Sequence, residues 1–143
     1  MPDQLVGTSP SLVDVITVLQ RQAVRGLGSM LAEDGFTVDQ WRVLRGLSDG
    51  EGHPMGDLAE SLQIAPASLT RVMDGLADAG LVFRRQPTSD RRRVTVHLAR
   101  RGQAKLQRLE DVVAAHEAAL QDTPQWREGL GRLRDSLDRD NRA

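Results

Sequence analysis

A helix followed directly by a basic hairpin, between residues 64 and 102, constrains this sequence more than any other feature. Within residues 66–79, four apolar side chains recur at the spacing of one buried helical stripe, namely Leu69, Val72, Met73 and Leu76. Gly80 is suited to end this helix in the left-handed conformation. Residues 81–83 then begin a strand, and residues 94–98 alternate apolar and polar side chains like a half-buried return strand.

Positive charge is concentrated on that hairpin. Residues 84–101 hold seven arginines and one acid, whereas residues 1–60 hold four arginines and nine acids, in a chain of net charge −1. A near-neutral protein with its positive charge gathered on one hairpin is suited to bind a polyanion there. The alternative is a solvated basic face without a partner.

The helix before the hairpin has the character of a recognition helix. Burial of its apolar stripe turns Ser68, Thr70 and Arg71 outward near its start, where they suit contact with base edges and phosphates. The full set of candidate DNA-binding residues is Ala67, Ser68, Thr70, Arg71, Arg84, Arg85, Asp90, Arg91, Arg92 and Arg93. Alternatives stay open, because Ser68 and Thr70 also suit a plain helix surface and Arg71 suits a base or a phosphate equally well.

The residues before this stretch predict three more helices. Ser9 and Pro10 are expected to begin the first, which continues to about Glu33. Thr37 and Gln40 have the spacing of a capping box for the second, which carries Trp41, Leu44 and Leu47 to the core. A short third helix is expected over residues 55–62, and His53 before Pro54 is expected in a loop. Two short helices joined by a tight turn form a helix-turn-helix, and the hairpin makes it winged.

The C-terminal residues predict two further amphipathic helices. The first is expected from about Arg100 to Gln121, and Thr123-Pro124 is expected to cap the second. A small winged domain cannot bury all the apolar surface of these helices and of the first helix. We therefore expect them to form an intertwined dimer core, with a monomer carrying a helical back layer as the alternative.

A series of motifs occurs in a fixed order along the chain. They are Phe36-Thr37-x-x-Gln40-Trp41-x-Val43-Leu44-x-x-Leu47, Asp57-Leu58-Ala59, Ser68-Leu69-Thr70-Arg71, Leu76, Gly80-Leu81-Val82, Asp90-Arg91-Arg92, Leu98 and Gly102. Together they resemble the MarR family of bacterial transcription regulators over roughly residues 10–140. The resemblance implies one MarR-like domain at 1–143 that is mainly α with a small β-hairpin wing. Its winged helix-turn-helix part lies at 36–99, and its dimerisation helices lie at 9–34 and 100–140.

The resemblance also implies a mode of action. A homodimer would place its recognition helices in successive major grooves of an inverted-repeat operator in double-stranded DNA, with the wings in the flanking minor grooves. Family members use the Asp-x-Arg of the wing, here Asp90 and Arg92, as a brace and a minor-groove probe. A small amphipathic, often phenolic, effector would release such a repressor, and Trp41 and Arg45 are weak candidates for its site. Core packing is the alternative role for Trp41.

Other functional classes receive little support. The chain has no cysteine and 3% aromatic residues, which argues against thiol chemistry and a base-stacking platform. No nucleophile elbow, P-loop or metal-binding histidine pair occurs, so we expect no enzyme, cofactor or metal site. No apolar run approaches the length needed to span a membrane, and no charged region followed by an apolar region is visible at the N-terminus, which predicts a cytoplasmic protein without a membrane partner. The second functional hypothesis is a winged-helix interaction module that binds an acidic protein through the hairpin.

Overall fold

The computed structural model describes residues 9–87 and 93–143 of the chain. Its helices are α1 (Leu12–Ala32), α2 (Val38–Gly46), α3 (Met55–Leu62), α4 (Pro66–Asp78), α5 (Arg100–Ala118) and α6 (Thr123–Asp140). Its strands are β1 (His53–Pro54), β2 (Val82–Arg85) and β3 (Thr95–Leu98). They form one antiparallel sheet in the order β1-β3-β2. The predicted fold class, mainly helical with a small wing, is confirmed.

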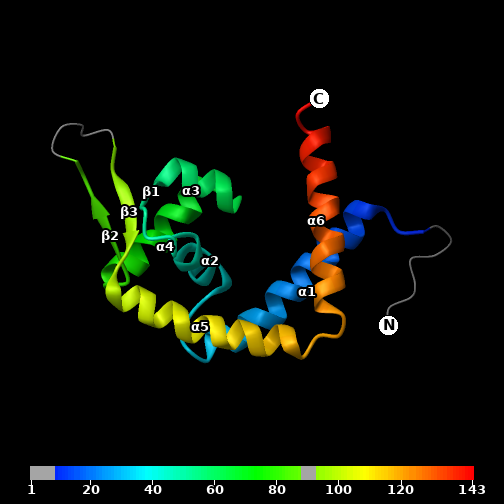
Figure 1. The fold of residues 1–143 in the computed structure, drawn as a ribbon, viewed down its shortest axis with the longest axis horizontal. Coiled ribbons are helices and arrows are strands. Elements are labelled where there is room, and N and C mark those ends of the chain that lie inside the picture. The colour runs from blue at the N-terminus through cyan, green and yellow to red at the C-terminus, as the bar shows by residue number, and fades with distance from the viewer. Residues whose placement is uncertain (1–8, 88–92) are drawn as a thin grey trace.

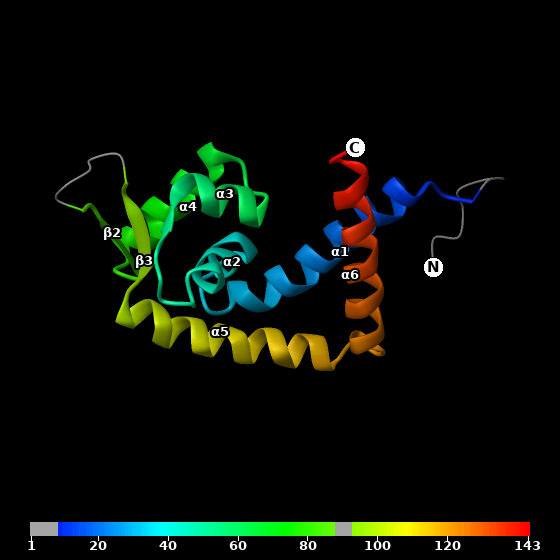
Figure 2. The ribbon, with the colours of Figure 1, turned by 45° about the horizontal axis from the view of Figure 1, so that its top comes forward.

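The molecule is elongated, with different elements at its two ends. The sheet, α3 and α4 lie at one end, and α6 and the start of α1 lie at the other (Figure 1). Helix α5 runs along the molecule and joins the sheet to α6. A second view shows the same separation of the winged end from α6 (Figure 2). Among the described residues, no helix combines the length and the apolar character needed to cross a membrane.

The hydrophobic core lies at the winged end and extends along α5. The predicted stripe of α4 is buried, with Leu69 and Met73 fully inaccessible and Val72 packed at the edge. Helix α2 contributes Val43 and Leu44, which are also fully inaccessible. The other buried side chains come from α1, α2, α3, α4, β2, β3 and α5 and from the loops beside them, namely Leu31, Trp41, Leu47, Leu58, Ala59, Ile64, Leu76, Leu81, Val82, Val96, Leu106, Leu109 and Val113.

Of the N-caps predicted from the sequence for α1 and α2, the one of α2 is confirmed and the one of α1 is not. Thr37 and Gln40 form the predicted capping box, with Gln40 N–H donating to Thr37 Oγ1 at 3.1 Å and Thr37 N–H donating to Gln40 Oε1 at 2.9 Å. The prediction that Ser9 begins the first helix is wrong. Ser11 is the N-cap, and its Oγ accepts from Asp14 N–H at 3.5 Å. Both serines satisfy the capping preference, so residue type alone could not separate them.

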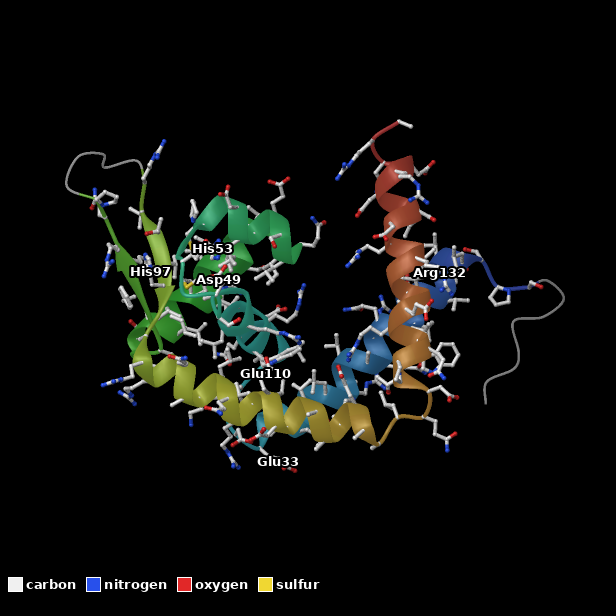
Figure 3. All side chains as sticks on the ribbon, viewed as in Figure 1. Glu33, Asp49, His53, His97, Glu110 and Arg132 are labelled. Atoms are coloured by element: carbon white, nitrogen blue, oxygen red, sulfur yellow. The ribbon has the colours of Figure 1, made fainter. Side chains whose placement is uncertain are left out.

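A third strand was missed, because His53 and Pro54 were expected in a loop. They form β1, in which His53 is opposite Val96 and Pro54 is opposite Thr95 on β3. The turn before it is held by Asp49, whose carboxylate accepts from Glu51 N–H at 3.0 Å and contacts His53 Nε2 at 2.7 Å. The Glu51 amide and then His53 lower the pKa of Asp49. Figure 3 shows Asp49 and His53 beside strand β3 of the wing.

Helix α6 begins differently from the prediction. The residue before it, Asp122, has left-handed backbone angles (φ 59°) and makes no side-chain cap. Thr123, the expected cap, donates its hydroxyl to Glu117 O at 2.9 Å and to Leu120 O at 3.1 Å. The threonine therefore closes the end of α5 rather than the start of α6. This role could not be predicted from the Thr-Pro pair alone, because it depends on how the chain turns between the two helices.

Candidate nucleic-acid interface

The start of α4 presents the predicted recognition residues to solvent. Ala67, Ser68, Thr70 and Arg71 are all exposed. Pro66 occupies the first turn, and its carbonyl accepts from Thr70 Oγ1 at 3.0 Å, which holds the threonine hydroxyl against the helix backbone. A hydroxyl, two methyl groups and a guanidinium on one exposed surface suit base edges and phosphates. Contact of these residues with DNA stays a prediction.

The described arginines of the wing fall on different faces. Arg84 Nη2 donates to Asp74 Oδ1 of α4 at 2.6 Å, so its guanidinium faces the recognition helix. Arg85 is exposed and lies over the ring of Phe83, with its Cζ 5.7 Å from the ring centroid. Arg93 is exposed at the start of the returning arm. The predicted tip residues Asp90, Arg91 and Arg92 lie outside the described residues.

The outward face of the wing carries a stacked pair that sequence reasoning did not find. The rings of Phe83 and His97 are 5.2 Å apart and nearly parallel, at 12°. His97 Nε2 also lies 2.8 Å from Thr95 Oγ1. Gly52 is needed beside them, because a Cβ there would lie 2.2 Å from His97 Cε1. Phe83 and His97 lie opposite each other on β2 and β3, so the stacked pair could be predicted only if the register of the hairpin were known. Figure 3 shows His97 on β3 near Asp49 and His53.

The wing is seated on the first turn of α5. Leu81 O accepts from Ala99 N–H at 2.9 Å, which joins the two ends of the hairpin. A Cβ on Gly102 would lie 2.0 Å from that same carbonyl oxygen, so only glycine permits this approach. On the other side, Leu81 N–H donates to Leu76 O at 2.9 Å. The base of the wing is therefore held between α4 and α5 by backbone contacts.

A groove lies between α1 and the start of α2, with a volume of about 650 Å³. Its walls are mainly apolar and include Val24, Gly28, Phe36 and Val38. Its polar lining comprises Gln20, Thr37, Asp39 and Arg42. Such a mixture, with a few polar groups over an apolar floor, is typical of small-molecule sites.

One polar group of this groove also contacts the helix-turn-helix. Arg42 Nη2 donates to Leu62 O, at the end of α3, at 2.6 Å. Its other terminal nitrogen, Nη1, is 3.8 Å from Asp39 Oδ1. Leu62 precedes the turn into the recognition helix, where Gln63 has a positive φ of 53°. Arg42 therefore connects the groove to the turn that precedes α4.

The predicted effector residues Trp41 and Arg45 lie together on α2 but do not line this groove. Trp41 is 9% exposed, and its indole N–H has no acceptor among the described residues. Arg45 Cζ is 5.5 Å from the Trp41 ring centroid, and its Nε is 3.7 Å from Glu110 on α5. Trp41 packs in the core, which is the alternative role that the sequence predicts for it. A role for both residues in effector binding stays a prediction.

Comparison with known proteins agrees with this architecture. The MarR family model matches residues 36–94. The HTH-type transcriptional repressor Rv2887 of Mycobacterium tuberculosis is 33% identical over 105 residues, which are 71% of this chain and 76% of that protein. Other relatives match over less of their own length, namely 64% of a regulator from Neisseria gonorrhoeae and 45% of a repressor from Bacillus subtilis.

Two solved structures resemble the whole chain. NadR in complex with 4-hydroxyphenylacetate has a TM-score of 0.71 and 28% identity, and the alignment covers 97% of this chain and 96% of NadR. The transcriptional repressor CouR, bound to a 23-mer DNA duplex, has a TM-score of 0.79 and 25% identity, with 90% and 92% covered.

The fold and the exposed helix with its wing define a winged helix-turn-helix protein. The chain belongs to the MarR family.

Proposed function

We propose that the chain is a homodimeric transcription regulator that binds duplex DNA sequence-specifically and represses transcription until a small effector releases it. The observation that carries the proposal is the exposed start of α4 beside the arginines of the wing, at one end of the molecule. The likeness to a repressor bound to DNA supports it. Such a regulator acts on the chromosome, so we place it in the cytoplasm.

The opposite end of the molecule supports the dimer. No residue of α6, all of which the structure describes, is buried. An isolated amphipathic helix is marginal in water, so α6 needs a partner surface. Large apolar side chains are exposed there, namely Leu12, Val13, Val15, Val18, Leu19 and Val24 of α1, Leu120 after α5, and Trp126, Leu130 and Leu137 of α6. A second copy of the chain is the partner that suits two such helices at once.

We assign the effector to the groove between α1 and α2. Its Arg42 offers a cation to a carboxylate, and its apolar walls suit a ring. The resemblance to NadR bound to 4-hydroxyphenylacetate, an aromatic acid, supports this class of ligand. Binding at Arg42 would compete with its hydrogen bond to Leu62 O and so change the position of the recognition helix.

The DNA-binding proposal is tested by selecting duplexes from a random pool with the purified protein at moderate salt. An enriched inverted repeat is the expected result, because a dimer with two recognition helices reads two half-sites. A pool that stays random, with the protein folded and dimeric, would contradict the proposal. It would favour the hypothesis of a module that binds an acidic protein partner.

The effector site is tested by calorimetric titration with 4-hydroxyphenylacetate as the probe. Arg42→Gln is expected to abolish the binding seen with the wild type, and Arg45→Gln, three residues along the same helix, is the matched control. Loss with Arg45→Gln and retention with Arg42→Gln would instead assign the site to Trp41 and Arg45. No binding by the wild type would exclude this simple aromatic acid as the effector.

A further inference from the structure

An ion pair joins the wing to the recognition helix. Arg84 of β2 and Asp74 of α4 are ten residues apart in sequence, and Arg84 Nη2 donates to Asp74 Oδ1 at 2.6 Å. Arg84 was among the residues predicted to contact DNA. In the structure, its guanidinium is hydrogen-bonded to a carboxylate of α4.

The strand pattern explains why Arg84 faces α4. Side chains two residues apart on a strand share a face, and Val82 is buried in the core at 3% exposure. Arg84 therefore continues the inner face of the wing. Phe83 and Arg85 lie on the other face, where Phe83 stacks with His97. The two arginines of β2 are thus distinguished by geometry, although they are adjacent in sequence.

The helix pattern places Asp74 beside the recognition surface. Asp74 is one turn beyond Thr70 and three residues beyond Arg71, so it shares their exposed face. A carboxylate at this position repels DNA phosphates, and an exposed ion pair contributes little to stability. Neither DNA attraction nor folding stability accounts for an acid at this site.

We propose that Asp74 and Arg84 form a strut that sets the position of the wing relative to the recognition helix. The strut rests on the proposed binding of duplex DNA. Arg84 is then a positioning residue, and Arg85, on the outer face, is the residue of β2 that contacts a DNA phosphate. The geometry of the pair determines whether the wing and α4 reach adjacent grooves together.

The direction in which one substitution changes the affinity for duplex DNA distinguishes the strut from simple electrostatic repulsion. Asp74→Asn removes a negative charge near DNA, so electrostatics alone predicts tighter binding. The strut predicts weaker binding, by about threefold, which is the size of measured couplings between exposed charged side chains. Asp78→Asn is the matched control, since Asp78 lies one turn further along α4 and has no ion pair among the described residues.

A double-mutant cycle and the salt dependence complete the experiment, which uses the full chain and the duplex selected by the wild type. The strut predicts that Asp74→Asn, Arg84→Gln and the double variant bind with similar, reduced affinity. The salt dependence is the slope of the logarithm of the binding constant against the logarithm of the salt concentration. The strut predicts that this slope is unchanged in Arg84→Gln, whereas its magnitude falls by about 1 in Arg85→Gln. Thermal unfolding of each variant confirms that the protein is folded.

Three results would overturn the strut. The first is binding by Asp74→Asn that is as tight as that of the wild type or of Asp78→Asn. The second is a loss of salt dependence in Arg84→Gln equal to that in Arg85→Gln. The third is a double variant whose loss of affinity is the sum of the two single losses. Each of these leaves the proposed function standing, because the wild type still binds the duplex. Failure of the wild type to bind any duplex would instead overturn the proposed function and the strut together.

Discussion

Replacement of Gly102 by alanine tests the seat of the wing on α5. The added Cβ would lie 2.0 Å from Leu81 O, whereas real Cβ contacts are not shorter than 3.0 Å, so the backbone must move by about 1 Å. Leu98 Cδ1, at 2.7 Å from the same position, limits movement on a second side. Overpacking of this kind costs about 1–3 kcal/mol. Loss of the bond from Ala99 N–H to Leu81 O adds about 0.5–1.5 kcal/mol.

We therefore expect Gly102→Ala to lower the free energy of unfolding by about 1.5–4.5 kcal/mol. Urea unfolding at one fixed protein concentration measures this, because the stability of a dimer depends on concentration. Gly75→Ala is the control, since Gly75 lies within α4 with no atom near its added Cβ. It should stabilise the protein by about 0.5–1 kcal/mol. Gly102→Ala with wild-type stability would refute the close approach.

Three further substitutions test other parts of the account. Thr37→Ala removes a capping-box acceptor and should cost about 1 kcal/mol in urea unfolding; no loss would argue against the cap. Leu130→Glu places a charge on the apolar face of α6 and should shift sedimentation from dimer to monomer or unfolded chain; an intact dimer would contradict the interface. Arg92→Ala should weaken duplex binding by about 1–3 kcal/mol in titrations at moderate salt, and unchanged affinity would contradict the role of the wing.

Helices and their buried faces could be predicted from the sequence because their signals are local. The stripe of α4 and the capping box of α2 each depend on residues within two turns of one another. The two strands of the hairpin were likewise predicted from alternation and flanking turn residues. The order of these signals was also sufficient to indicate the MarR family.

Features that depend on contacts between distant segments could not be predicted. Strand β1 has two residues and exists because β3, about forty positions later, offers an unpaired edge. Arg84 and Arg85 are equivalent in sequence, and only the packing of β2 on α4 gives them different partners. The groove at Arg42 forms between α1 and α2, so no single segment indicates it. The pattern of α2 alone indicated Trp41 and Arg45 as effector residues, because it carries no information on how α1 packs against α2.

Duplex binding as a function of half-site spacing tests most directly whether the protein is a dimeric, sequence-specific regulator. The protein would be titrated with the selected inverted repeat, with a single half-site, and with repeats lengthened by about five base pairs, which is half a helical turn. We expect tight binding to the repeat with the selected spacing and loss of most affinity for the other two duplexes, because two recognition helices in a fixed dimer require one separation. Equal affinity for all three would contradict a dimeric, sequence-specific regulator.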